Sequence, residues 1–169
     1  MNLYLRLIYL LIKSWGKTPI TPLGTSVIHM KVLPNDLDIN FHMNNGRFLT
    51  IMDLGRMDLL KRTGTLGMAV KNKWMPIVGT ATIDFLRPLK LWQSYELHTQ
   101  ITHWDDKWFY LEQTFYSRNK EIAKGTIKGL LRAKSGNVSP QEIMEKLSPG
   151  IISPGVDNPE PSEMIENEV

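Results

Sequence analysis

The strongest constraint on the fold is a long apolar helix in the first half of the chain. Within residues 45–62 the apolar side chains recur at three- and four-residue spacings, which is the period of an α-helix. Asn44 or Asn45 can cap the start of this helix, and Gly64 can end it. Its apolar positions are Phe48, Leu49, Ile51, Met52, Leu59 and Leu60. So wide an apolar face cannot stay in solvent, and the rest of the domain must wrap around it.

Strand patterns flank this helix. β-Branched residues or alternating apolar and polar residues mark the strands, and short polar turns separate the later ones. Consecutive strands with short turns indicate antiparallel pairing. The expected strands are 25–33, a segment within 74–90, 94–104, 108–117 and 121–133. A short helix is expected over residues 139–147, with Pro140 in its first turn.

One strand, a long apolar helix and four antiparallel strands predict an α+β domain. The economical way to bury the helix is a curled antiparallel sheet wrapped round it, which is the hotdog fold. Such a sheet leaves an edge strand whose free N–H and C=O groups invite pairing with a second copy. We therefore expect a homodimer or a tetramer.

The chain divides into three expected regions. Residues 1–18 form an apolar N-terminal helix, which Pro19 and Pro22 terminate. Residues 19–148 form the hotdog domain. Residues 149–169 are rich in proline and acidic residues and poor in apolar ones, so we expect a disordered tail.

The N-terminal segment has two interpretations. Residues 3–13 are apolar except for Arg6 and Lys13, and this stretch is too short to span a bilayer core of about 30 Å. No small-residue cleavage site follows it, which disfavours a secretory signal. The segment either packs on the domain or a dimer partner, or lies in a membrane surface with Arg6, Lys13 and Lys17 facing anionic lipid. We expect a cytoplasmic protein, associated with the inner face of the membrane in the second case.

Composition excludes several function classes. The absence of cysteine removes disulfides, a thiolate nucleophile and Cys-based zinc sites. The four histidines lack metal-ligand spacing and no glycine-rich phosphate loop is present, so we expect neither metal nor cofactor. A net charge of only +3 without a long basic run argues against nucleic-acid binding.

Chemistry-bearing residues concentrate in residues 33–49, whose sequence is LPNDLDINFHMNNGRFL. The string Asp-Leu-Asp-x-Asn-x-His-x-Asn-Asn resembles the active-site signature of plant acyl-carrier-protein thioesterases. The Asp-x-Asp element before the helix is similar to that of the 4-hydroxybenzoyl-CoA thioesterase group. Together with residues 102–112, the motif most resembles a thioesterase-like group that carries an apolar N-terminal segment. The resemblance covers about residues 25–134.

This resemblance implies hydrolysis of an acyl thioester carried on CoA or on acyl carrier protein, with Asp38 as the catalytic carboxylate. Asp38 would activate water as a general base or attack the thioester directly. Asn40 and His42 match the Asn and His of the plant enzymes, where they would orient water or polarise the substrate. Backbone N–H groups of Asn45 and Gly46, at the start of the helix, would bind the thioester oxygen as negative charge develops on it.

The chain also departs from the plant pattern. A further Glu of those enzymes is replaced here by Pro88, so catalysis would rest on one carboxylate. Asp53 coincides with an acidic position of related hotdog enzymes, but we expect it to pair with Arg56 or Arg47. Asp36 is expected to cap its turn.

Two alternative functions follow from the same features. A hotdog hydratase or dehydratase also uses a histidine with a carboxylate, although the motif is thioesterase-like. A non-catalytic acyl-binding or membrane-associated hotdog protein is favoured by the missing Glu and the apolar N-terminus. The sequence does not distinguish CoA from acyl carrier protein as the carrier of the acyl group, because it does not show where the basic residues that would bind phosphate lie in the fold. The candidates are Arg87, Lys90, Lys128 and Arg132.

Overall fold

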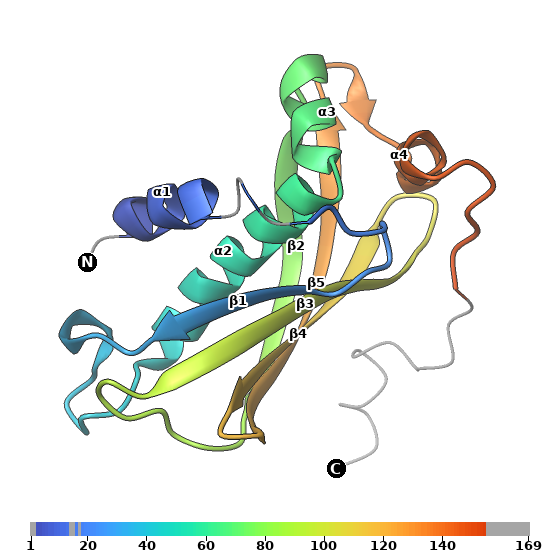
Figure 1. Cartoon of the computed structure of the whole chain (residues 1–169). Helices are drawn as coiled ribbons and strands as arrows, with labels where there is room; N and C mark the ends of the chain where they lie inside the picture. Colours follow the sequence, from blue (N-terminus) through green and yellow to red (C-terminus); the bar gives the residue numbers. More distant parts are fainter. Residues whose placement is uncertain (1–2, 14–15, 17, 155–169) are drawn as a thin grey trace, which may run out of the picture.

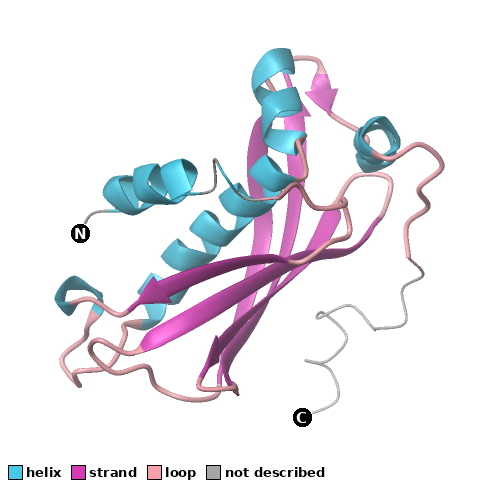
Figure 2. Ribbon diagram, viewed as in Figure 1, coloured by secondary structure: helices cyan, strands magenta, loops and turns pink. Residues whose placement is uncertain are grey.

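The computed structural model describes residues 3–13, 16 and 18–154 of the chain, and it has the predicted hotdog architecture (Figure 1). An antiparallel sheet curls round the long helix α2, and shorter helices lie outside it (Figure 2). The described elements are α1 (Leu3–Lys13), β1 (Ser26–Lys31), the 3-10 helix η2 (Pro34–Asp36), α2 (Asn45–Arg62), α3 (Thr65–Asn72), β2 (Met75–Phe85), β3 (Ser94–Trp104), β4 (Phe109–Ser117), β5 (Lys120–Ala133), β6 (Gly136–Asn137) and α4 (Pro140–Leu147).

The strand order in the sheet is β1-β3-β4-β5-β2, and the short β6 pairs with β5. Every pair is antiparallel, as the sequence predicts. The expected ranges agree closely with the observed elements, but η2, α3 and β6 are additional to them. β2 is an edge strand, and nearly all of its residues are exposed on both faces. The sheet therefore keeps the long open edge that the sequence argument requires.

A glycine brings α2 close to the sheet. A Cβ at Gly55 would lie 2.6 Å from Thr99 Oγ1 and 2.7 Å from Leu97 Cδ2, so any other residue would push the helix outward. The buried Gln113 fixes this contact, because its Nε2 donates to the Met52 carbonyl at 3.0 Å. The buried apolar residues of α2 thereby join the core that the sheet encloses, with β1 and β3 beside the helix.

Two charged side chains of α2 form the predicted ion pair. Arg56 forms an ion pair with Asp53, and its Nη1 also donates to Gln113 Oε1 at 2.8 Å. Burial lowers the pKa of Arg56, and the neighbouring Asp53 carboxylate opposes that shift. The expectation that Asp53 is structurally paired is confirmed.

The N-terminal helix packs on the domain. Leu10 of α1 is buried, and Lys61 of α2 donates from Nζ to the Leu11 carbonyl at 2.6 Å. Arg6, which would face anionic lipid if the segment lay in a membrane surface, is 3% exposed and faces the domain. The segment therefore packs on the domain, and the part of the membrane interpretation that concerns Arg6 is wrong because Arg6 has a buried carboxylate partner, described below. None of the helices in the described part of the chain is long and apolar enough to cross a membrane.

The start of the predicted tail is ordered against the sheet. The backbone N–H of Trp104 donates to Ser153 Oγ at 2.9 Å, and Gln141 Nε2 donates to the Ile151 carbonyl at 2.9 Å. These contacts place residues 149–154 on the domain. The remainder of the predicted disordered tail, residues 155–169, lies outside the described residues.

Candidate active site

The candidate catalytic residues lie on a short hairpin that spans residues 36–44. At its base the Asn44 N–H donates to the Asp36 carbonyl at 2.8 Å, and nearer the tip the Asp38 N–H donates to the His42 carbonyl at 2.8 Å. The hairpin begins at η2 and ends at the cap of α2. These two hydrogen bonds place the hairpin beside the N-terminus of the central helix.

Asp38 and His42 project from the same side of this hairpin. They face one another across its two arms, and opposite residues of an antiparallel pair place their side chains on one face. Their neighbours Leu37 and Met43 form the adjoining β-bridge, and Met43 is buried in the core. Because side chains alternate along a strand, Asp38 and His42 point away from the core, and both are half-buried.

The backbone orients the Asp38 carboxylate. Its Oδ1 accepts the N–H of Asn40 at 2.8 Å and the N–H of His42 at 3.2 Å, as in an Asx turn. Within the described chain, no other hydrogen bond or ion pair reaches this carboxylate. One oxygen is therefore fixed in direction, and the second is open to a ligand.

The hairpin tip is apolar and exposed. Ile39 is 93% exposed and Phe41 is 77% exposed, and Asn40 between them also faces solvent. Phe41 has φ 58°, a left-handed conformation that bulky side chains rarely adopt.

Among the described residues, no hydrogen bond joins the side chains of Asp38, Asn40 and His42. The structure thus gathers the three predicted residues on one hairpin without linking them into a triad.

Two backbone N–H groups at the N-terminus of α2 are predicted to bind the thioester oxygen. One of them is available, and the other is already hydrogen-bonded. Asn44 is the helix cap, and its Oδ1 accepts the Gly46 N–H at 2.8 Å. The N–H of Asn45 has no acceptor in the described chain. N–H groups of the first helical turn carry partial positive charge and have no partner within the helix. Asn45 is therefore the better placed of the two predicted oxyanion donors, because Gly46 is already bonded.

A buried ion pair supports the base of the hairpin. Arg6 Nη2 lies 2.5 Å from Asp36 Oδ2, which also accepts the Leu33 N–H at 2.9 Å. Arg47 Nε lies 3.8 Å from the other carboxylate oxygen. The neighbouring Tyr95 hydroxyl is buried, and burial raises the pKa of Tyr95 far above its ordinary value. Asp36 therefore has the structural role we expected, but the sequence does not reveal its partner on α1, 30 residues away.

The segment that follows β2 packs against the hairpin. The Met43 N–H donates to the Leu89 carbonyl at 2.8 Å, and His42 forms a β-bridge with Lys90. Pro88, which replaces the Glu of the plant enzymes, is exposed directly before this contact. Residue 88 therefore directly precedes the segment that contacts the hairpin, and it carries no ionisable group.

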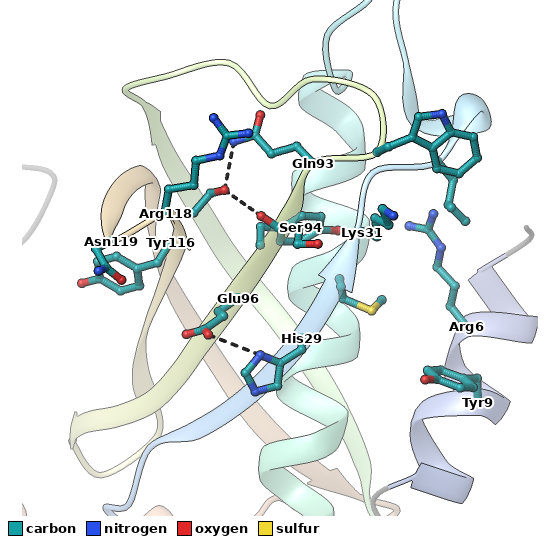
Figure 3. Close-up of a pocket in the computed structure, with 15 residues that line it drawn as sticks. Arg6, Tyr9, His29, Lys31, Gln93, Ser94, Glu96, Tyr116, Arg118 and Asn119 are labelled. Atoms are coloured by element: carbon teal, nitrogen blue, oxygen red, sulfur yellow. Dashed lines mark hydrogen bonds and ion pairs between the residues drawn. The ribbon is translucent and has the colours of Figure 1, made fainter.

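A cavity of about 790 Å³ opens around β1 and β3, and α1 forms one of its walls (Figure 3). Arg6 and Tyr9 line it from α1, and His29 and Glu96 line it from the strands. His29 Nδ1 lies 3.3 Å from Glu96 Oε1, and a hydrogen bond from His98 lowers the pKa of Glu96. The candidate catalytic residues are not part of this lining. No group of His, Asp and Glu in the described chain is arranged to hold a metal ion.

Comparison with known families gives one clear match. The model of the thioesterase-like superfamily matches residues 32–147, which include the whole hairpin, α2 and the sheet after it.

Individual relatives agree with this match. Protein THEM6 of Danio rerio is 36% identical over 145 residues, 85% of this chain and 71% of that protein. The chain spans only 55% and 62% of the THEM6 proteins of Xenopus laevis and Drosophila melanogaster. A probable thioesterase of Saccharomyces cerevisiae, YBR096W, is 26% identical over 121 residues, 66% of this chain and 50% of that protein. Among solved structures, the probable thioesterase YbaW of Escherichia coli superposes with a TM-score of 0.67 at 19% identity, over 73% of this chain and 96% of that one.

Proposed function

Because the chain belongs to the thioesterase-like superfamily, we propose that it hydrolyses acyl thioesters of CoA or acyl carrier protein at the 36–44 hairpin. The observation that carries the proposal is the Asp38 carboxylate. Two backbone N–H groups fix one of its oxygens, and the other is unbonded, on the hairpin that leads into the N-terminus of α2. A fixed carboxylate with one open oxygen is what a general base requires.

The proposed reaction needs one water molecule. The open oxygen of Asp38 takes a proton from water, and the resulting hydroxide attacks the thioester carbonyl carbon. The negative charge that forms on the carbonyl oxygen is stabilised by the Asn45 N–H and the positive end of α2. The intermediate collapses by breaking the C–S bond, and the thiolate recovers the proton from Asp38. The products are a free acid and a free thiol.

Asn40 and His42 have positioning roles in this proposal. Each donates its backbone N–H to Asp38 Oδ1, and the His42 side chain lies on the same face of the hairpin as Asp38. From that face the imidazole can orient the attacking water or the substrate carbonyl. The lack of a bonded His–Asp pair favours this role over that of a relay.

The active site is proposed to need a second copy of the chain. Ile39 and Phe41 are exposed beside Asp38, and the nearby cavity does not include that carboxylate. Ligand sites that hold a long acyl chain are normally deep and mostly apolar, so another wall is required. The open edge of β2 can pair with the same edge of a second copy across a two-fold axis. We therefore expect a homodimer with two equivalent sites.

The first test is thiol release. The full chain is incubated with acyl-CoAs of increasing chain length, an aromatic acyl-CoA and an acyl carrier protein thioester, and free thiol is followed with a chromogenic reagent. We expect turnover of at least one substrate. An enoyl-CoA in the same series separates hydration of the double bond, which releases no thiol, from hydrolysis. Binding without thiol release or hydration across the series would contradict the proposal and leave a non-catalytic acyl-binding protein.

A further inference from the structure

The N-terminal helix carries an apolar surface that the fold does not cover. Tyr4, Leu5, Ile8, Tyr9 and Ile12 of α1 have between 51% and 70% of their surface exposed. α1 packs outside α2, so these side chains lie at the periphery of the molecule (Figure 1). Apolar residues at this density on one helix face are typical of an interaction surface.

Helix α3 extends this surface. An open, mainly apolar groove of about 610 Å³ separates α1 from α3, and Val70 on its far side is 71% exposed. We call these apolar residues the α1–α3 face. Its members are Tyr4, Leu5, Ile8, Tyr9 and Ile12 of α1, with Leu66 and Val70 of α3.

The exposure of this face is fixed by contacts on the opposite side of α1. Arg6 is held in the buried ion pair with Asp36, and Leu10 is buried in the core. The Leu11 carbonyl accepts a hydrogen bond from Lys61. Turning the α1–α3 face inward would expose Leu10 and break the ion pair. The domain therefore presents the face outward.

The charges around the face have one sign. Neither α1 nor α3 contains an acidic residue, and Lys13, Lys71 and Lys73 are exposed at the ends of the two helices. Two tyrosines, Tyr4 and Tyr9, add rings with an apolar body and a polar tip, which suit the boundary between headgroups and acyl chains. A two-fold contact through this face would bring like charges together, which disfavours a second copy as the occupant.

We propose that the α1–α3 face docks the protein on the surface of a membrane that contains anionic lipid. Eleven residues of helix are about 16 Å long, which is too short for a core of about 30 Å, so α1 lies in the plane of the surface. The apolar side chains enter the acyl region, and the lysines meet the headgroups. Because Arg6 bonds Asp36 at the base of the hairpin, the docked helix is tied directly to the candidate active site.

The test uses the full chain and needs no substrate, so it is independent of the proposed hydrolysis. Co-sedimentation is measured with vesicles of phosphatidylcholine alone and of phosphatidylcholine with phosphatidylserine. We expect binding to the anionic vesicles that weakens as salt rises. The double variant Ile8→Asp/Ile12→Asp should bind at least about tenfold more weakly. Ile152→Asp is the matched control, because Ile152 is 81% exposed but belongs to another surface, and it should bind like the wild type.

A charge variant separates the contribution of the lysines to vesicle binding from that of the apolar side chains. Lys71→Glu/Lys73→Glu should remove the preference for anionic vesicles and leave the fold intact, because both side chains are exposed on α3 or directly after it. The proposal is overturned if the wild type binds neither kind of vesicle, or if Ile8→Asp/Ile12→Asp binds as well as the wild type. If the double variant in that case also loses its oligomeric state, the α1–α3 face is a contact between copies and not a membrane-binding surface.

Discussion

The ion pair between Arg6 and Asp36 should stabilise the whole molecule and not only the N-terminal helix. Its side chains are 4% and 0% exposed, and it joins α1 to the hairpin. Replacing Asp36 with Asn keeps the shape of the side chain and an acceptor for the Leu33 N–H. It leaves the Arg6 guanidinium buried without its counter-charge. Arg47 does not compensate, because it is itself a cation.

The expected cost follows from the geometry. Removing one partner of a buried ion pair typically destabilises a protein by about 3–5 kcal/mol. α1 can partly escape this cost by undocking, which returns Arg6 to water but exposes Leu10. We therefore expect a loss of about 3 kcal/mol for Asp36→Asn and a similar loss for Arg6→Met. The double variant has no buried charge at this site. Its loss of stability should therefore be about 2 kcal/mol smaller than the sum of the two single losses.

The assay is urea unfolding of the four proteins, followed by circular dichroism and by tryptophan fluorescence. The two probes also report whether α1 undocks before the domain unfolds. If the loss of the double variant equals the sum of the two single losses within about 0.5 kcal/mol, Arg6 and Asp36 are not coupled, and the ion pair does not stabilise the base of the hairpin.

Three further predictions concern α2 and the sheet. Gly55→Ala should lower the free energy of unfolding by about 1–3 kcal/mol, because its Cβ would meet Thr99 Oγ1 at 2.6 Å. The control Gly67→Ala in α3 has nothing within 4 Å and should stabilise by up to about 1 kcal/mol, so equal effects in urea unfolding would contradict the packing account. Gln113→Leu removes the centre of the buried polar network under α2 and should cost about 1–3 kcal/mol, whereas a stabilised variant would show that the network is dispensable. Ala81→Lys, near the middle of the exposed edge strand β2, should give monomers in sedimentation velocity, and an unchanged assembly would exclude pairing through that edge.

Local signals predict most of the fold. Residues 45–62 have a helical apolar period between a cap, Asn44, and a stop, Gly64, so the sequence predicts α2 to the residue. β3 is predicted equally well because its polar and apolar residues alternate along a half-buried strand. α3 is not predictable in this way, since eight residues with a central Gly67 carry too little periodicity.

Long-range contacts explain what the sequence does not reveal. The motif places Asp38, Asn40 and His42 together because they are neighbours in the chain. The partner of Arg6 lies 30 residues away, and nothing in the local sequence shows that this arginine is buried. The oxyanion prediction treats Asn45 and Gly46 alike, whereas the Asn44 side chain competes for one of the two N–H groups.

If Asp38 is the base or nucleophile of a thioester hydrolase, its amide variant should be folded and almost inactive. With the best substrate of the thiol-release series, kcat/KM of Asp38→Asn should fall by about 10²-fold or more, while circular dichroism and the unfolding midpoint stay near those of the wild type. Asp106→Asn, an exposed carboxylate in the turn before β4, is the matched control and should keep full activity. An Asp38→Asn variant that is folded and hydrolyses the substrate at close to the wild-type rate would contradict the assignment of the active site.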